Sequence, residues 1–103
     1  SFTTPGVLCR EGILIAITTD SPVVPQEYLP LCAALAMKDG LPEEEALKAI
    51  TINPAKILGL EKRIGSIEEG KDGDIIICDS SLLDIQNVIR YTIINGEIAY
   101  QKA

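Results

Sequence analysis

The chain has 103 residues, which is enough for one small domain with a modest hydrophobic core. Its net charge of −6 argues against binding to nucleic acid or to an anionic membrane, because both need clustered lysine and arginine. Hydrophobic residues make up 47% of the sequence, a high share for so small a soluble domain, so we expect other protein to cover some apolar segments.

The three cysteines, Cys9, Cys32 and Cys78, favour a reducing compartment. Their number is odd and no C-x-x-C occurs, so the sequence indicates neither a disulfide framework nor a zinc knuckle. No run of 18 apolar residues predicts a membrane span, and the first residues lack the pattern of a signal peptide. We therefore expect a cytoplasmic protein. Because residue 1 is not methionine, we also expect the chain to begin inside a longer protein.

The first elements predicted along the chain are a short helix and a buried strand. A proline near its start and Gly12 at its end predict a helix over residues 4–11. Residues 13–19 form a continuous apolar run, which is typical of a strand buried on both faces, as in a parallel sheet. The run ends at Asp20, and two prolines predict a loop over residues 21–25.

Three further helices are predicted next. Residues 26–38 are apolar nearly all round, which indicates a helix buried on most sides. Residues 42–45, a proline followed by three glutamates, suit the start of another helix, where the dipole is positive. Asn53 and Pro54 repeat the pattern of a cap followed by proline, and predict a short helix that ends near Gly59.

The composition changes near residue 60 from helical to β. Residues 74–78 read as a strand. Residues 88–94 and 97–100 read as two strands joined by Asn-Gly at 95–96, the preferred dipeptide of a type I′ hairpin turn. The chain therefore divides into an α/β half and a β half.

Asp20 is the main candidate for a functional residue. A carboxylate at the end of a buried strand lies where α/β barrels carry their catalytic groups. The same aspartate could instead form an ordinary Asx turn or cap the next helix. A zinc site takes at least three protein ligands, but the chain has no histidine, and its other carboxylates lie in helix starts and polar turns.

Two other patterns favour structural interpretations. The acidic residues at 43–45 and 68–69 are best explained as solvated helix-start and turn residues. Residues 65–74 contain three glycines, but a phosphate-binding loop needs a helix after its glycines, and here a strand is predicted to follow. We therefore interpret residues 65–74 as turns.

Two separated motifs occur in a characteristic order. After the strand that ends in Thr-Asp at 19–20, residues 51–60 read Thr-Ile-Asn-Pro-Ala-Lys-Ile-Leu-Gly-Leu, and residues 65–74 read Gly-Ser-Ile-Glu-Glu-Gly-Lys-Asp-Gly-Asp. With the closing hairpin, essentially the whole chain resembles the C-terminal quarter of a metal-dependent amidohydrolase. The stretch Thr-Asp-Ser-Pro-Val-Val-Pro at 19–25 is most similar to the imidazolonepropionase and prolidase-like branch of that superfamily.

The resemblance implies an α/β fold made of two partial domains. Residues 1–60 would be the C-terminal piece of a (β/α)8 barrel, with 13–19 as its last strand. Residues 61–103 would be the C-terminal part of a small composite β-sandwich. In the family, the segments around Asn53 and 65–74 connect the two domains and carry no chemistry. Gly73 stands where the family usually has alanine, a difference expected to affect only strand stiffness.

The resemblance also implies an activity for the parent protein. It would hydrolyse a C–N bond of an amide, a cyclic amide or imine, or a dipeptide, through a water activated by a divalent metal, expected to be zinc. Asp20 would be both metal ligand and general base. The remaining ligands are absent from this chain, so the isolated chain is expected to be inactive. The rest of the parent barrel, or a second copy of the chain, would cover its apolar surface. The alternative is a non-catalytic interaction or oligomerisation module built on the β half.

Overall fold

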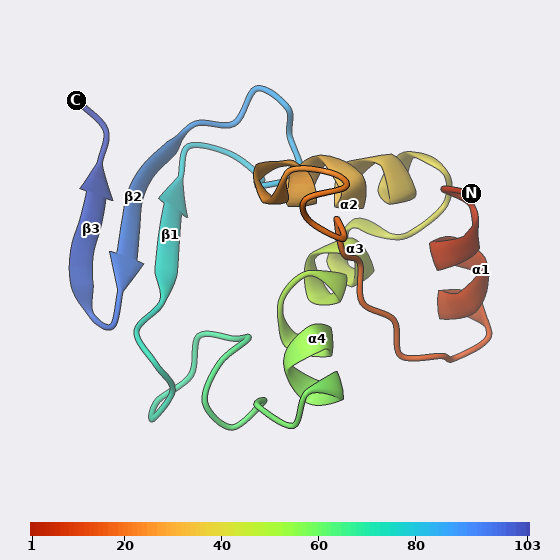
Figure 1. Cartoon of the computed structure of the whole chain (residues 1–103), viewed down its shortest axis with the longest axis horizontal. Helices are drawn as coiled ribbons and strands as arrows, with labels where there is room; N and C mark the ends of the chain where they lie inside the picture. The colour runs from red at the N-terminus through yellow and green to blue at the C-terminus, as the bar shows by residue number, and fades with distance from the viewer.

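The structure, a computed structural model, describes all 103 residues and contains helices followed by an antiparallel sheet. Figure 1 shows the helices together on one side of the molecule and the strands on the other, joined by one long connection, while the loop between the first two strands reaches back toward the helices. None of the helices is long and apolar enough to span a membrane. The elements are α1 (Thr4–Arg10), the 3₁₀ helix η1 (Gln26–Tyr28), α2 (Leu29–Lys38), α3 (Glu43–Ala49), α4 (Ile52–Ile57), β1 (Ile75–Cys78), β2 (Ile89–Ile94) and β3 (Glu97–Gln101).

Most helix boundaries follow from local sequence signals. Helix α1 ends just before Gly12, whose φ of 78° lies in the left-handed region that glycine adopts without strain. Helix α3 follows Pro42, and its first turn carries the three glutamates. The single helix predicted over residues 26–38 is instead η1 followed by α2. Pro30 has no N–H with which to continue an α-helix from Gln26, so the regular helix begins only at Leu29.

The role predicted for Asn53 as a helix cap is wrong. Helix α4 begins at Ile52, two residues earlier than a cap at Asn53 would place it, because Thr51 (φ −131°, ψ −91°) is the residue that leaves the helical region. Asn53 lies inside the first turn of α4 and is buried. Its side-chain amide is therefore free to make a contact with a distant part of the chain.

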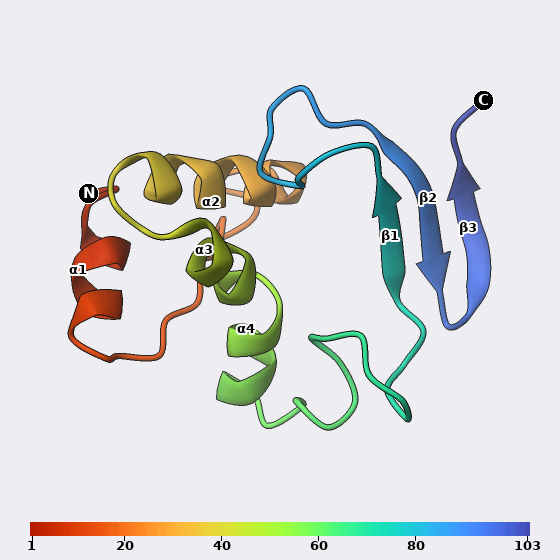
Figure 2. The same ribbon diagram turned by 180° about the vertical axis from the view of Figure 1, so that it is seen from behind.

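The strand predicted over residues 13–19 does not form in this structure. The segment is extended, but it pairs with no other strand and runs past α3 well apart from the sheet (Figure 2). Ile13 and Leu14 stay about half exposed, at 51% and 49%. A β-strand needs a neighbour to satisfy its backbone groups, and no other segment of this chain lies beside residues 13–19 as a strand.

The three strands form one antiparallel sheet in the order β1-β2-β3. The predicted hairpin is confirmed: Asn95 and Gly96 have φ values of 52° and 78°, positive at both turn positions as a type I′ turn requires. Gly73 has a different role from the one expected. Its carbonyl accepts the Gly96 N–H, and a Cβ at residue 73 would lie 2.9 Å from that nitrogen. A side chain at residue 73 would therefore disturb the close approach of the hairpin turn, rather than the stiffness of a strand.

The buried core is small for a chain of this length. Only 10 of 103 residues are buried, and the central cluster is largely alanine. The accessible surface is 7178 Å², whereas the size scaling of monomeric proteins gives about 5,700 Å² for 11.1 kDa. The radius of gyration, 14.1 Å, likewise exceeds the roughly 12.8 Å that scaling gives for a compact domain of this length. The chain therefore leaves about 1,500 Å² more surface open than a self-contained domain does.

Part of this open surface lies on the sheet. Figures 1 and 2, which view the molecule from opposite sides, show no helix in front of the sheet or behind it. Ile76, Ile94, Ile98 and Tyr100 are accordingly 40–61% exposed. An antiparallel sheet normally buries at least one face, so this one lacks its cover within the chain.

Candidate functional site

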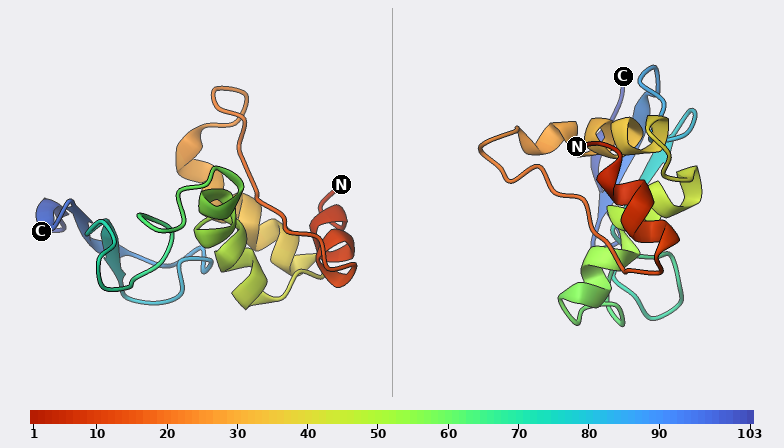
Figure 3. Two further views of the ribbon diagram at one scale, coloured as in Figure 1. Left: turned by 90° about the horizontal axis from the view of Figure 1, so that it is seen from below. Right: turned by 90° about the vertical axis from the view of Figure 1, so that its right-hand side faces the viewer.

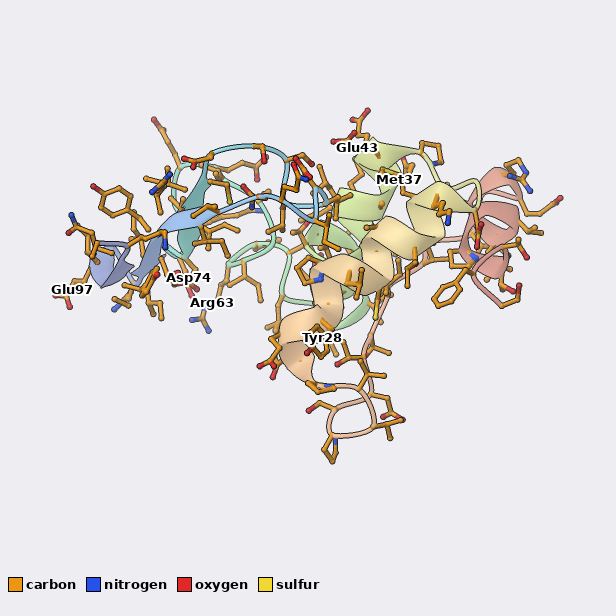
Figure 4. The ribbon with its side chains drawn as sticks, turned by 90° about the horizontal axis from the view of Figure 1, so that it is seen from above. Tyr28, Met37, Glu43, Arg63, Asp74 and Glu97 are labelled. Carbon is orange, nitrogen blue, oxygen red and sulfur yellow. The ribbon has the colours of Figure 1, made fainter.

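Asp20 lies at the end of the extended segment, where the chain turns into a projecting loop. Figure 3 shows this loop standing out from the helices in the view from the side, and Figure 4 shows it beyond Tyr28. Thr19 is buried, with 7% of its surface exposed, whereas Asp20 is exposed. Thr19 therefore anchors the end of the extended segment, and the carboxylate of Asp20 is exposed to solvent.

Neither structural role considered for Asp20 is observed. Its carboxylate accepts no hydrogen bond and joins no ion pair, so it forms no Asx turn. The following helix, η1, has Pro25 at its N-cap and no side-chain cap. The local hydrogen bonds use the Asp20 backbone instead: its N–H donates to Thr18 Oγ1 (3.1 Å) and its carbonyl accepts from the Val23 N–H (2.9 Å). The carboxylate is left free.

The backbone of Asp20 is in a conformation that few residues adopt. Its φ is 53°, and Asp20 and Asn95 are the two non-glycine residues with a positive φ. Asn95 has its explanation in the hairpin turn, whereas Asp20 sits at the end of an extended segment. Non-glycine residues in the left-handed region cost of order 1–3 kcal/mol and concentrate at functional sites. The backbone conformation is therefore a second observation, independent of the position of Asp20 in the sequence, that marks this residue as a candidate functional residue.

The residues of this chain do not by themselves fit a metal centre. No group of three or more His, Cys, Asp or Glu side chains comes together anywhere in the structure. The three cysteines are free and come from separate elements. Since a zinc ion takes at least three protein ligands, Asp20 can be no more than one member of a set completed from outside the chain.

The acidic and glycine-rich patterns are structural, as the sequence predicted. In the first turn of α3, Glu44 and Glu45 lie 3.7 Å and 3.6 Å from Lys48. In the 65–74 connection, the Lys71 ammonium donates to Glu68 at 2.9 Å, and this hydrogen bond holds the pKa of Glu68 below its ordinary value. No helix follows these glycines, so they form turns and no phosphate-binding loop.

Asn53 is a residue whose role the sequence did not reveal. It and Thr19 are the two buried polar residues of the chain. The Asn53 side-chain Nδ2 donates to the backbone carbonyl of Ile15 at 3.0 Å, so it contacts the segment that leads to Asp20. Asparagine directly before Pro54 matches the pattern of a helix cap, so the sequence carried no signal for a partner 38 residues away.

Comparison with known proteins identifies the class of protein. The model of the amidohydrolase family matches residues 3–99, so the chain belongs to the amidohydrolase family. This confirms the resemblance seen in the sequence. Among curated relatives, the imidazolonepropionase of Thermoplasma acidophilum is 34% identical over 99 residues, covering 88% of this chain and 24% of that protein. The N-acetylglucosamine-6-phosphate deacetylase of Bos taurus is 42% identical over 62 residues, covering 60% of the chain and 14% of that protein.

Two solved structures share the fold. The amidohydrolase from Thermotoga maritima MSB8 superposes with a TM-score of 0.94 at 43% identity, covering 99% of this chain and 27% of that one. A Xaa-Pro dipeptidase with methionine bound in its active site gives a TM-score of 0.81 at 25% identity, covering 98% of this chain and 25% of the other. The chain thus spans about a quarter or less of the length of these relatives.

Proposed function

We propose that this chain acts as the C-terminal part of a larger metal-dependent amidohydrolase, the parent enzyme, which hydrolyses a C–N bond in a small molecule. The family match and the names of the relatives, an imidazolonepropionase, a deacetylase and a dipeptidase, support this class of reaction. The small share of each relative that the chain covers, and the open surface of about 1,500 Å², support its being part of a larger fold.

In this proposal residues 1–60 are the last part of a (β/α)8 barrel and residues 61–103 part of a small β-sandwich. The extended segment 13–19 then becomes the final barrel strand once neighbouring strands from the parent pair with it. Its half-exposed Ile13 and Leu14, and the uncovered Ile94 and Ile98 of the sheet, are the surfaces that the remainder of the parent would bury. Burial on this scale is the main force that would hold the two parts together.

The observation that carries the proposal is the free carboxylate of Asp20 at the end of this segment. In TIM-barrel enzymes, catalytic groups lie where the strands end. A carboxylate with no intramolecular partner can offer oxygen to a divalent metal and can also accept a proton from an attacking water. We assign both roles to Asp20.

The metal, expected to be zinc, would supply polarisation of water at neutral pH. Asp20 would contribute one oxygen ligand and would take up the proton that the water loses. The buried Thr19 anchors the backbone directly before Asp20. The positive φ of Asp20 then sets the direction in which its side chain leaves the backbone. Zinc needs at least two further protein ligands, which must come from the rest of the parent, since this chain has no histidine.

Replacing Asp20 with asparagine in the parent enzyme tests the assignment. Asparagine tolerates a positive φ at least as well as aspartate, so the fold should be preserved. It cannot accept the proton, and loss of general base catalysis alone lowers the rate about 10²–10⁴-fold. The matched control is Asp39→Asn, the same change at an exposed residue that follows α2, for which we expect the wild-type rate. If the Asp20→Asn enzyme kept a rate within about threefold of wild type, the role would be refuted, because the expected loss is about 10²–10⁴-fold.

A second, non-catalytic function has one observation in its favour. The sheet leaves Ile76, Ile94, Ile98 and Tyr100 exposed, and exposed apolar residues can serve protein–protein interaction. The full reading frame separates the two candidates. A His-x-His at a strand end upstream, followed by later histidines, supports the enzyme, whereas a start codon directly before Ser1 supports an interaction module.

A further inference from the structure

Two hydrogen bonds join residues 14–19 to helices α3 and α4. The Asn53 side-chain Nδ2 donates to the Ile15 carbonyl at 3.0 Å, and the Ile17 N–H donates to the Ala49 carbonyl at 2.9 Å. Both partners belong to the stretch from the end of α3 to the first turn of α4. The segment that carries Asp20 is therefore held on one side by α3 and α4, while its other side is open.

We propose that Asn53 is a positioning residue for Asp20, acting through the backbone of residues 15–19. This inference rests on the proposed function of Asp20. Asn53 is 6% exposed and is fixed in the first turn of a helix, so its side chain is a rigid support. Ile15 and Ile17 are partly buried and pack against the core cluster, and the buried Thr19 precedes Asp20 directly. The contact sets the depth and the register of the segment on which the carboxylate is mounted.

The chemistry of the contact explains why asparagine is required. A backbone carbonyl can only accept, so the atom 3.0 Å from the Ile15 oxygen must be the amide nitrogen of Asn53. An ionised aspartate has the same shape but no donor, and it would set a negative oxygen against the carbonyl. Alanine would remove the donor and leave the Ile15 carbonyl without a partner. The start of α4 is itself secured by the Thr51 Oγ1–H, which donates to the Leu47 carbonyl at 2.7 Å.

The first experiment measures backbone hydrogen exchange in the parent enzyme. We expect Asn53→Asp and Asn53→Ala to speed exchange in residues 13–19 by roughly 10- to 100-fold, from loss of one buried hydrogen bond, with the amides of α2 unchanged. The matched control is Asn87→Asp. Asn87 makes its contact through Oδ1, which accepts from the Ser80 N–H at 3.1 Å, and aspartate keeps this acceptor. Asn53→Ala introduces no charge, so the same measurement can be made on this variant if Asn53→Asp fails to fold. Unchanged exchange in residues 13–19 would overturn the inference.

The second experiment asks whether Asn53 acts through Asp20. The substrate is whichever of a panel of N-acetylated amino acids and Xaa-Pro dipeptides the wild-type parent turns over fastest. We expect Asn53→Ala to lower kcat about 10²-fold with little change in KM, the effect of a misplacement of about 1 Å. In an Asp20→Asn background the same substitution should change the residual rate by less than about threefold, because the positioned group is already disabled.

The outcomes separate the inference from the proposed function. Equal rate losses in the two backgrounds would mean that Asn53 supports the fold generally, and would overturn its link to Asp20. An active Asp20→Asn enzyme would instead refute the proposed function. In that case the exchange of residues 13–19 would still show whether Asn53 holds the segment, because this readout does not depend on the chemistry of Asp20.

Discussion

Gly65 and Gly70 lie in the same connection and allow backbone strain to be separated from steric overlap. Both have a positive φ, 98° and 87°, so alanine at either position would occupy the left-handed region. Their surroundings differ. A Cβ at residue 70 would meet nothing within 4 Å, whereas a Cβ at residue 65 would lie 2.9 Å from Ala55 Cβ and 3.0 Å from Ile52 Cα. The contact with Ile52 Cα involves backbone, which cannot move aside cheaply.

The structure gives a magnitude for each substitution. Gly70→Ala should lower the free energy of unfolding by about 1–2 kcal/mol, the usual cost of a left-handed conformation for a residue with a Cβ. Gly65→Ala carries the same cost and adds about 1–3 kcal/mol for overpacking against α4. The total for Gly65→Ala is about 2–5 kcal/mol, so the difference between the two variants measures the overlap alone.

Urea unfolding of the parent enzyme, followed by a probe on residues 52–75, is the assay. Gly65→Ala should move the midpoint to lower urea by clearly more than Gly70→Ala does, with similar slopes in both variants. Equal losses of stability in the two variants would refute the steric reasoning and leave only the strain of the positive φ. A loss below about 1 kcal/mol in Gly65→Ala would refute both parts.

Three further outcomes are expected. The purified 103-residue chain, assayed with zinc against amide and dipeptide panels, should show no turnover, because one ligand cannot hold a catalytic zinc. Metal-dependent turnover that disappears in Asp20→Ala would contradict this expectation. The isolated chain should also self-associate through its open apolar segments, seen as a rise in light scattering with concentration; a clean monomer with slow hydrogen exchange in residues 13–19 would show that the segment is self-sufficient. The Arg90 guanidinium donates to Asp79 and holds the pKa of Asp79 below its ordinary value of 3.8. The contribution of this pair is therefore complete above pH 3.8 and is lost as the pH falls through the lower folded pKa. Hydrogen exchange in β1 and β2 should rise over that acidic window in the wild type but show no such rise in Arg90→Gln, and identical profiles would contradict the assignment.

The sequence alone determined the elements whose signals are local. Asn-Gly at 95–96 specified the hairpin, because only a few residue types accept two successive positive φ values. The proline and glutamates at 42–45 predicted the start of α3. The order of motifs was enough to find the family, and it pointed to Asp20 as the candidate site residue. Each of these conclusions depends on residues close together in the chain or on the order of motifs along it, and neither requires knowledge of contacts between distant segments.

The tertiary structure decided what depends on contacts between distant segments. Residues 13–19 are apolar enough to be a strand, but pairing needs a second strand, and the chain supplies none beside them. Asn53 looked like a cap because of Pro54, yet its partner is the Ile15 carbonyl, 38 residues away. Gly73 looked like a flexible strand residue, yet the backbone of Gly96 lies against it. Hydrogen bonds and close approaches across tens of residues leave no local pattern, so only the folded arrangement shows which side chain meets which backbone group.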